Sequence, residues 1–145
     1  MNDLEDIIVI QNGERVPNTF PTAEYDRRLG LLRRHMTVAD IDVALFSSYQ
    51  CINYYGDFLF CHFGRFYALV VDQDTQTSLS ANIDGGQPWR RTVGDNLIYT
   101  DWTRDTYFKA LQRLIQDGGR SGNESDLMPV QNMKKRKAAS PHTTY

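Results

Sequence analysis

Hydrophobic residues recur along two stretches of the chain at the spacing of an α-helix. Tyr25, Leu29, Leu32 and Met36 follow one another at intervals of four, three and four residues, which places them on one helix face. Thr22 precedes this face and is predicted to cap the helix, with Arg27, Arg28, Arg33 and Arg34 on its solvated side. A similar pattern over residues 104–116 predicts a second helix, which ends before Gly118 and Gly119.

Short runs of apolar and β-branched residues predict strands between and around these helices. The runs cover residues 6–10, 41–47, 66–71 and 97–100, and a turn over residues 72–75 leads into a further predicted strand over residues 77–81. Asn12 and Gly13 favour a type I′ turn, so the first strand is predicted to enter a hairpin. Because strands alternate with helices, we expect an α/β domain with a small mixed sheet flanked by helices.

The composition changes after Arg120, and this change predicts a domain boundary. Residues 121–145 show no apolar periodicity and contain the basic cluster Lys134–Lys137. Such a segment offers too little apolar surface to offset the entropy of ordering. We therefore expect residues 1–120 to form one domain and residues 121–145 to be a disordered, unrelated tail, in which the basic cluster has no function.

Composition and charge narrow the classes of function. The chain has 145 residues and a formal net charge of −2, so it lacks the basic surface of a nucleic-acid-binding domain. Its acidic N-terminus does not fit a signal peptide, and no apolar run could span a bilayer. Two cysteines suit a reducing compartment better than a disulfide scaffold. We expect a cytoplasmic protein with no nucleic-acid and no membrane partner.

Candidate metal ligands and nucleophiles form weak patterns. Cys51, Cys61, His35 and His62 include no tight ligand pair of the kind that zinc sites show, so buried structural thiols are the favoured interpretation. None of the three histidines, His142 included, belongs to a nucleophile-elbow sequence. No catalytic residue and no metal ligand is therefore assigned.

Two glycine-rich or arginine-rich stretches have competing interpretations. Residues 84–86 lack the spacing of a phosphate-binding loop and are predicted to form a turn. Trp89-Arg90-Arg91, together with Trp102 and Arg104, could bind an anion or stack on a flat cation. Packing of arginines on aromatic faces is the favoured alternative.

Phe63-Gly64-Arg65 is the sharpest candidate for a binding site. Gly64 permits a tight backbone between two functional side chains. Arg65 can present a planar fork to a carboxylate, and Phe63 can supply an apolar wall. From the residues alone, a surface salt bridge is the default interpretation of Arg65.

Several long, irregular strings resemble the N-terminal domain of creatinase, an amidinohydrolase of the pita-bread superfamily. The resemblance spans roughly residues 7–117. It rests on residues 20–28, Ile41-Asp42, Ile52–Tyr55, Phe63-Gly64-Arg65, residues 82–96 and Tyr99–Trp102. It implies a ribonuclease-H-like layout and a homodimer whose active site lies between the N-terminal domain of one subunit and the catalytic domain of the other.

The resemblance also implies a role for two residues. Phe63 and Arg65 match the family motif that lines the creatine pocket, with Arg65 facing the substrate carboxylate. The family's catalytic groups lie in its larger domain, so none is carried over, and no cofactor or metal is implied. The expected partners are a creatine-like small molecule and a second subunit, either another copy of this chain or a full-length creatinase-like protein.

The expected function is therefore that of one part of an enzyme that hydrolyses creatine to sarcosine and urea, inactive by itself. One alternative is a non-catalytic dimerisation or interaction module. Another is the N-terminal domain of a metal-dependent prolidase-like peptidase or lyase. The change near Arg120 leads us to hypothesise a truncated, alternatively spliced or mis-framed product of a creatinase-like gene.

Overall fold

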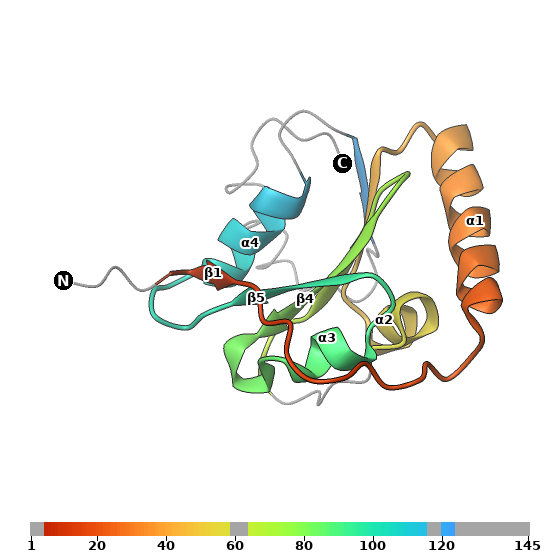
Figure 1. The fold of residues 1–145 in the computed structure, drawn as a ribbon. Coiled ribbons are helices and arrows are strands. Elements are labelled where there is room, and N and C mark those ends of the chain that lie inside the picture. The colour runs from red at the N-terminus through yellow and green to blue at the C-terminus, as the bar shows by residue number, and fades with distance from the viewer. Residues whose placement is uncertain (1–4, 59–63, 116–119, 124–145) are drawn as a thin grey trace.

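Helices cover both faces of a six-stranded mixed sheet in the computed structural model, which describes residues 5–58, 64–115 and 120–123 (Figure 1). The prediction of an α/β domain with a small mixed sheet flanked by helices is confirmed. The elements are β1 (Ile7–Ile8), α1 (Thr22–Val38), β2 (Val43–Phe46), α2 (Tyr49–Gly56), β3 (Ala68–Val71), β4 (Gln76–Ala81), the 3₁₀ turn η1 (Asn82–Asp84), α3 (Gln87–Arg91), β5 (Asp95–Tyr99), α4 (Thr106–Ile115) and β6 (Ser121–Asn123).

The strand order in the sheet is β1-β5-β4-β3-β2-β6. Strands β2, β3 and β4 form an antiparallel meander, and β5 then joins β4 in parallel after the crossover through α3. The outer strands are β1, antiparallel to β5, and β6, parallel to β2. This order places the C-terminal end of β5 beside the start of the chain.

Alternate residues of the strands build two hydrophobic cores, one on each face of the sheet. Leu45, Val70 and Leu79 point toward α4, which packs on one face. Leu69 and Val71 point the other way and pack with residues of α1 and α2. Because both faces are covered, β3 is apolar throughout (Ala68–Val71) instead of alternating with polar residues. Its neighbours β4 and β5 bury Ser78, Ser80 and Asn96, whose side chains bond one another.

The predicted face of α1 is confirmed, since Tyr25, Leu29 and Met36 are buried and Leu32 is partly buried. The predicted cap is wrong: Pro21 occupies the N-cap position, and no side chain bonds the first turn. Thr22 is instead the first helical residue. A proline before a helix sets an extended backbone that enters the first turn without a side-chain cap.

The prediction of a fully solvated arginine side on α1 is also wrong. Arg28 is buried, with its guanidinium 4.7 Å from the ring centre of Phe20 and 4.2 Å from that of Tyr54. Its Nη1 donates to the Tyr54 carbonyl oxygen at 2.7 Å. Tertiary contacts with aromatic residues that lie outside the helix therefore override the helical pattern.

The predicted hairpin at Asn12-Gly13 does not form. Strand β1 pairs with β5 in the register Ile7↔Tyr99 and Ile8↔Ile98, and these partners lie 92 and 90 residues apart in the sequence. Gly13 does have a positive φ of 73°, but the chain then continues across α3 toward α1. The Asn12 Oδ1 accepts a hydrogen bond from Arg90 Nη1 at 3.0 Å, so its side chain serves this contact and not a turn.

Three elements lie outside the predicted set: α2, α3 and β6. A local signal for α2 exists, because Ser48 caps it by accepting from the Cys51 amide at 3.1 Å. Strand β6 extends the sheet three residues beyond the predicted boundary at residue 120. Residues 124–145, including Lys134–Lys137, lie outside the described residues, as do Gly118 and Gly119.

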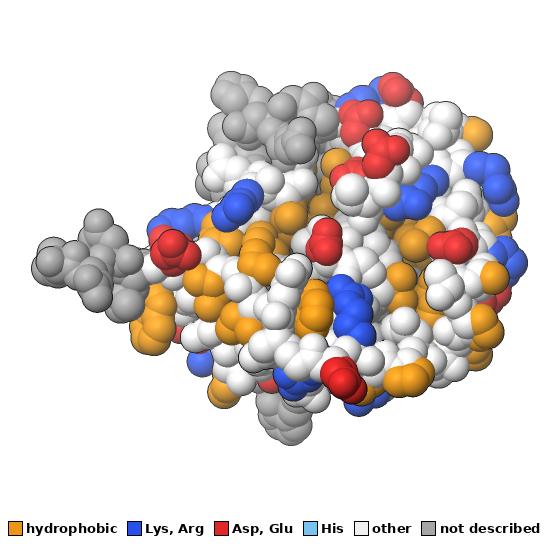
Figure 2. All heavy atoms as spheres, viewed as in Figure 1, with side chains coloured by type: hydrophobic (Ala, Val, Ile, Leu, Met, Phe, Trp, Pro, Cys, Tyr) orange, Lys and Arg blue, Asp and Glu red, His pale blue; other side chains and the backbone are white. Residues whose placement is uncertain are grey.

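Charges of both signs are interspersed with hydrophobic side chains over the face in Figure 2. This mixture agrees with the small net charge of −2. Among the described helices, none has both the length and the apolar character that crossing a membrane would require.

Candidate functional site

Arg65 lies in an irregular segment that leads into β3. The preceding residue, Gly64, has a positive φ of 70°, and a Cβ placed there would meet no atom within 4 Å. Glycine is therefore favoured here by backbone conformation and not by lack of space. Phe63, the other predicted binding residue, lies outside the described residues.

The Arg65 guanidinium pairs with the carboxylate of Asp101. Its Nη2 lies 3.1 Å from Asp101 Oδ2, and its Nη1 lies 3.4 Å from Oδ1. The two side chains are 43% and 44% exposed, so water screens the pair and its net contribution to stability is about 0–1 kcal/mol. The default interpretation of Arg65 as a surface salt bridge thus agrees with its observed contact.

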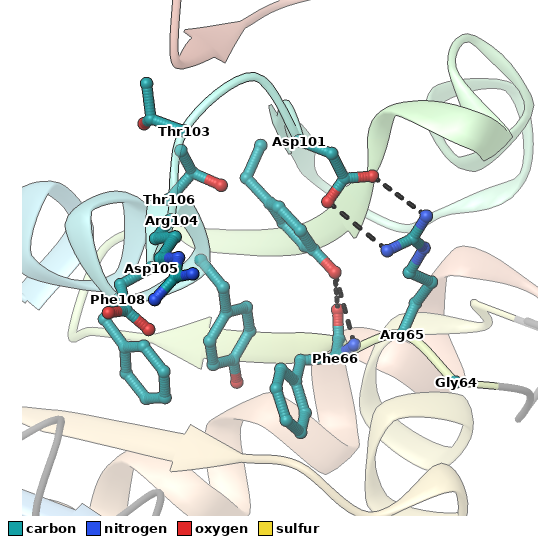
Figure 3. A pocket seen from close by; sticks show the side chains of 11 residues that line it. Gly64, Arg65, Phe66, Asp101, Thr103, Arg104, Asp105, Thr106 and Phe108 are labelled. Atoms are coloured by element: carbon teal, nitrogen blue, oxygen red, sulfur yellow. Dashed lines mark hydrogen bonds and ion pairs between the residues drawn. The ribbon is translucent and has the colours of Figure 1, made fainter.

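A cavity of about 380 Å³ opens beside this pair (Figure 3). Residues 64–66 line one side, and Tyr99, Asp101 and residues 103–108 line the other. Phe66, Tyr99, Tyr107 and Phe108 give the cavity aromatic walls, and Arg65, Asp101, Arg104 and Asp105 give it two charges of each sign. Such a cavity suits a small molecule that combines a charged end with an apolar or planar part.

Tyr99 connects the two sides of the cavity. Its phenol oxygen accepts from the Phe66 amide at 3.2 Å and donates to the Phe66 carbonyl oxygen at 3.0 Å. Burial raises the pKa of Tyr99 to about 12, and the negative charge of Asp101 adds to this rise. The Phe66 amide and Arg65 act in the opposite direction but do not outweigh burial.

The raised pKa of Tyr99 predicts a loss of stability in alkali. The phenol holds its proton more tightly in the folded chain than in the unfolded chain. Its contribution to the free energy of unfolding is therefore complete below pH 10 and declines as the pH rises from 10 to about 12. The decline reaches about 1.4 kcal/mol per pH unit for one proton. Urea unfolding between pH 8 and 12 measures it, with Tyr99→Phe as the control for other titrating groups. Equal declines in both proteins would contradict the prediction.

The structure separates the residues of the predicted arginine–tryptophan set. Trp89-Arg90-Arg91 lies on α3, where the Arg15 guanidinium stacks 4.7 Å from the Trp89 ring centre. The Val16 amide donates to the Arg90 carbonyl oxygen at 3.0 Å, so α3 serves to hold the N-terminal segment. Arg104 lines the same cavity as Arg65, whereas Trp102 is 56% exposed. Packing is therefore the observed role of Trp89, and Arg104 belongs to the candidate site.

Within the described residues, the remaining sequence candidates form no second site. Residues 84–86 form the turn that was predicted, with η1 followed by Gly86 at a φ of 85°. Asp84 accepts a hydrogen bond from the Tyr67 phenol. Cys61 and His62 lie outside the described residues, and within the described part no three His, Cys, Asp or Glu side chains gather as a metal would require.

A second cavity, of about 500 Å³, lies between α1 and α2 around the buried Arg28. The Arg28 Nε donates to Glu24 at 2.8 Å, and Phe20 and Tyr54 flank the guanidinium. Burial raises the pKa of Asp57, at the end of α2, but hydrogen bonds from Thr19, Asn18 and Tyr25 leave it below its ordinary value. Arg28 and Asp57 are buried, whereas the Arg65 side chain is 43% exposed, so the cavity around Arg65 is the better candidate.

Tyr99 and Asp101 are the site residues that pattern analysis missed. Both belong to the string Tyr99–Trp102, which contributes to the resemblance but matches no functional motif. A usable signal is its position at the end of a predicted strand. Tyr99 is the last residue of β5, and Asp101 follows it at the rim of the sheet.

Comparisons with known proteins agree with this architecture. A family model described as the creatinase/prolidase N-terminal domain matches residues 28–145. A creatinase from Bacillus sp. (strain B-0618) is 45% identical over 148 aligned residues, which cover 99% of this chain and 36% of that protein. The chain thus spans little more than a third of the length of this curated relative.

Solved structures of the same shape come from dipeptidases. The creatinase/prolidase N-terminal domain of an X-Pro dipeptidase from Streptococcus pyogenes has a TM-score of 0.71 at 15% identity, covering 82% of this chain and 92% of that one. A proline dipeptidase from Streptococcus pneumoniae TIGR4 has a TM-score of 0.71 at 19% identity, covering 81% and 87%. At these identities the likeness concerns the fold alone.

Proposed function

Because the chain belongs to the creatinase/prolidase N-terminal domain family, we propose that it supplies the carboxylate-binding part of a creatine-hydrolysing active site. The reaction of the whole enzyme would convert creatine and water to sarcosine and urea. This chain would bind and orient the substrate, and its partner would supply the catalytic groups. No cofactor or metal enters this proposal.

The observation that carries the proposal is the position of the Arg65 fork at the mouth of a cavity with aromatic walls. A guanidinium binds a carboxylate through two parallel charge-assisted hydrogen bonds. Holding the carboxylate of creatine there would fix the distance from its guanidino carbon to groups of a second domain. Phe63 would add an apolar wall to the same site.

The surface beside the cavity supports a partner at this site. Phe66 and Trp102 are 48% and 56% exposed, and each adjoins one member of the Arg65–Asp101 pair. Large exposed apolar side chains at a charged cavity are typical of an interaction surface. We propose that a catalytic domain, from another copy or from a full-length creatinase-like subunit, covers this side and completes the site.

Urea release in a two-component assay tests this function. We expect no urea from the 145-residue chain with creatine alone, and urea release after addition of a separately prepared creatinase catalytic domain. Arg65→Ala should lower the activity of the mixture about ten- to a hundredfold, since hydrogen bonds to charged groups contribute about 1.5–3 kcal/mol.

Arg34→Ala is the matched control, because Arg34 is an exposed arginine of α1. It should leave the activity of the mixture unchanged. Urea release by the chain alone, or a mixture that is insensitive to Arg65→Ala, would contradict the proposal.

A second candidate function is that of the N-terminal domain of a metal-dependent prolidase-like enzyme. The fold that the chain shares with dipeptidase domains is compatible with this function. The same mixture distinguishes the two through its products. Release of proline from an Xaa-Pro dipeptide, without urea from creatine, would favour the peptidase. Binding to a full-length subunit without either product would favour a non-catalytic interaction module.

A further inference from the structure

We propose that Tyr99 and Asp101 are positioning residues that together fix Arg65 for its ligand. This inference rests on the proposed function, because it concerns how the same arginine is held. It assigns a role to the C-terminal end of β5, which contains no candidate catalytic group.

The two residues hold Arg65 from two directions. Tyr99, the last residue of β5, bonds both the amide and the carbonyl oxygen of Phe66, which directly follows Arg65. Asp101, two residues later, bonds the guanidinium. One contact therefore fixes the backbone next to Arg65 and the other fixes the far end of its side chain, as Figure 3 shows.

The segment around Arg65 depends on these contacts for its order. Residues 64–66 belong to no helix or strand, and β3 begins only at Ala68. In the ladder between β3 and β4 the last described pair is Ala68↔Leu79, so sheet pairing does not hold residue 66. The Tyr99 phenol instead supplies both hydrogen bonds that a neighbouring strand would give to the Phe66 backbone.

The geometry leaves room for a ligand on Arg65 while Asp101 stays bound. Asp101 contacts the two terminal nitrogens, Nη1 and Nη2. A guanidinium has a second edge, formed by Nε and one terminal nitrogen, and within the described ranges no acceptor for Nε is found. A substrate carboxylate can bind this second edge, so Asp101 orients the fork without having to leave it.

Preorganisation explains why this arrangement would increase affinity. A free arginine side chain samples many rotamers, and binding a ligand then costs the entropy of selecting one. Anchoring both ends before the ligand arrives removes part of that cost. The opposing expectation is that Asp101 competes with the substrate carboxylate for the charge of Arg65. Replacing Asp101 with a neutral residue should weaken creatine binding under the first expectation and strengthen it under the second.

Nuclear magnetic resonance on the 145-residue chain separates these possibilities. We would measure hydrogen exchange of the Phe66 amide, the ¹⁵N relaxation of Arg65 Nε, and the affinity for creatine from shift changes. Tyr99→Phe should speed exchange of the Phe66 amide about tenfold or more. Asp101→Asn should make Arg65 Nε more mobile, and each variant should weaken creatine binding about three- to tenfold.

Two control variants match the chemistry of each change. Tyr25→Phe removes a buried phenol of α1 that bonds the Asp57 side chain. Asp95→Asn removes a negative charge from the exposed start of β5. Neither control should alter the Phe66 or Arg65 signals, and thermal melting of every variant checks that the fold persists.

The outcomes distinguish this inference from the proposed function. Unchanged exchange of Phe66 in Tyr99→Phe, or tighter creatine binding by Asp101→Asn, would overturn the positioning role. A wild-type chain that does not bind creatine at any concentration would refute the proposed ligand instead. In that case the Phe66 and Arg65 signals alone decide whether the two residues hold the arginine.

Discussion

Replacing Arg28 with alanine is expected to lower the free energy of unfolding by about 3 kcal/mol. The side chain is only 8% exposed, and it bonds Glu24 Oε1 at 2.8 Å and the Tyr54 carbonyl oxygen at 2.7 Å. Its guanidinium also lies against the rings of Phe20, Tyr25 and Tyr54. Truncation removes the donor of the part-buried bond to the Tyr54 carbonyl and opens a space between α1 and α2.

Urea denaturation at neutral pH measures this loss of stability. Two further variants of α1 serve as comparisons. Arg34→Ala removes an exposed arginine and should change stability by less than about 0.5 kcal/mol. Arg28→Lys keeps a charge but loses the planar fork, so its stability should fall between the two. If Arg28→Ala and Arg34→Ala cost the same, the aromatic surroundings of Arg28 do not stabilise the fold.

Gly94→Ala is expected to cost about 3 kcal/mol as well, for a steric reason. Gly94 has a φ of 87°, and a Cβ at this position would lie 2.6 Å from the backbone oxygen of Gln76. The left-handed backbone alone costs an alanine about 1–2 kcal/mol. The clash adds to this because Gln76 begins β4 and its side chain donates to the Val93 carbonyl oxygen at 2.7 Å, so neither strand can move away freely.

Gly30→Ala provides the opposite control. Gly30 lies within α1, and a Cβ there would meet no atom within 4 Å. Alanine should therefore stabilise the helix by about 0.5–1 kcal/mol. Thermal unfolding of the two variants should move in opposite directions. A tolerated Gly94→Ala would show that the approach between Gly94 and Gln76 relaxes easily.

Periodicity predicted the main helices and strands because each of them buries one face or both faces. The spacing of Tyr25, Leu29, Leu32 and Met36 located α1, the apolar runs located β2, β3 and β5, and the turn at residues 72–75 located β4. The same approach missed α2, whose eight residues are too few to establish a helical repeat. The Asn12-Gly13 hairpin failed because a local turn preference contains no information about β5, which supplies the actual partner of β1.

The candidate site was predictable in part. Arg65 and the neighbouring Gly64 could be singled out from the motif, and the fold places Arg65 at a cavity. Its partner Asp101 lies 36 residues away in sequence, and no pattern in the chain connects the two. Arg28 illustrates the same limit, since the Tyr54 carbonyl that it bonds is 26 residues distant. Contacts at such separations depend on the strand order, which the sequence alone left open.

The strand order also governs when the site can assemble during synthesis on the ribosome. The Asp6 carbonyl oxygen accepts from the Thr100 amide at 2.9 Å, and the Asp6 carboxylate bonds Thr103 and Lys109 at 2.7 and 2.6 Å. The first described residues of the chain therefore hold the segment that carries Asp101. A nascent chain has to keep its N-terminal strand unpaired until β5 and the start of α4 have left the exit tunnel, so the cavity beside Arg65 is among the last parts of the domain to form.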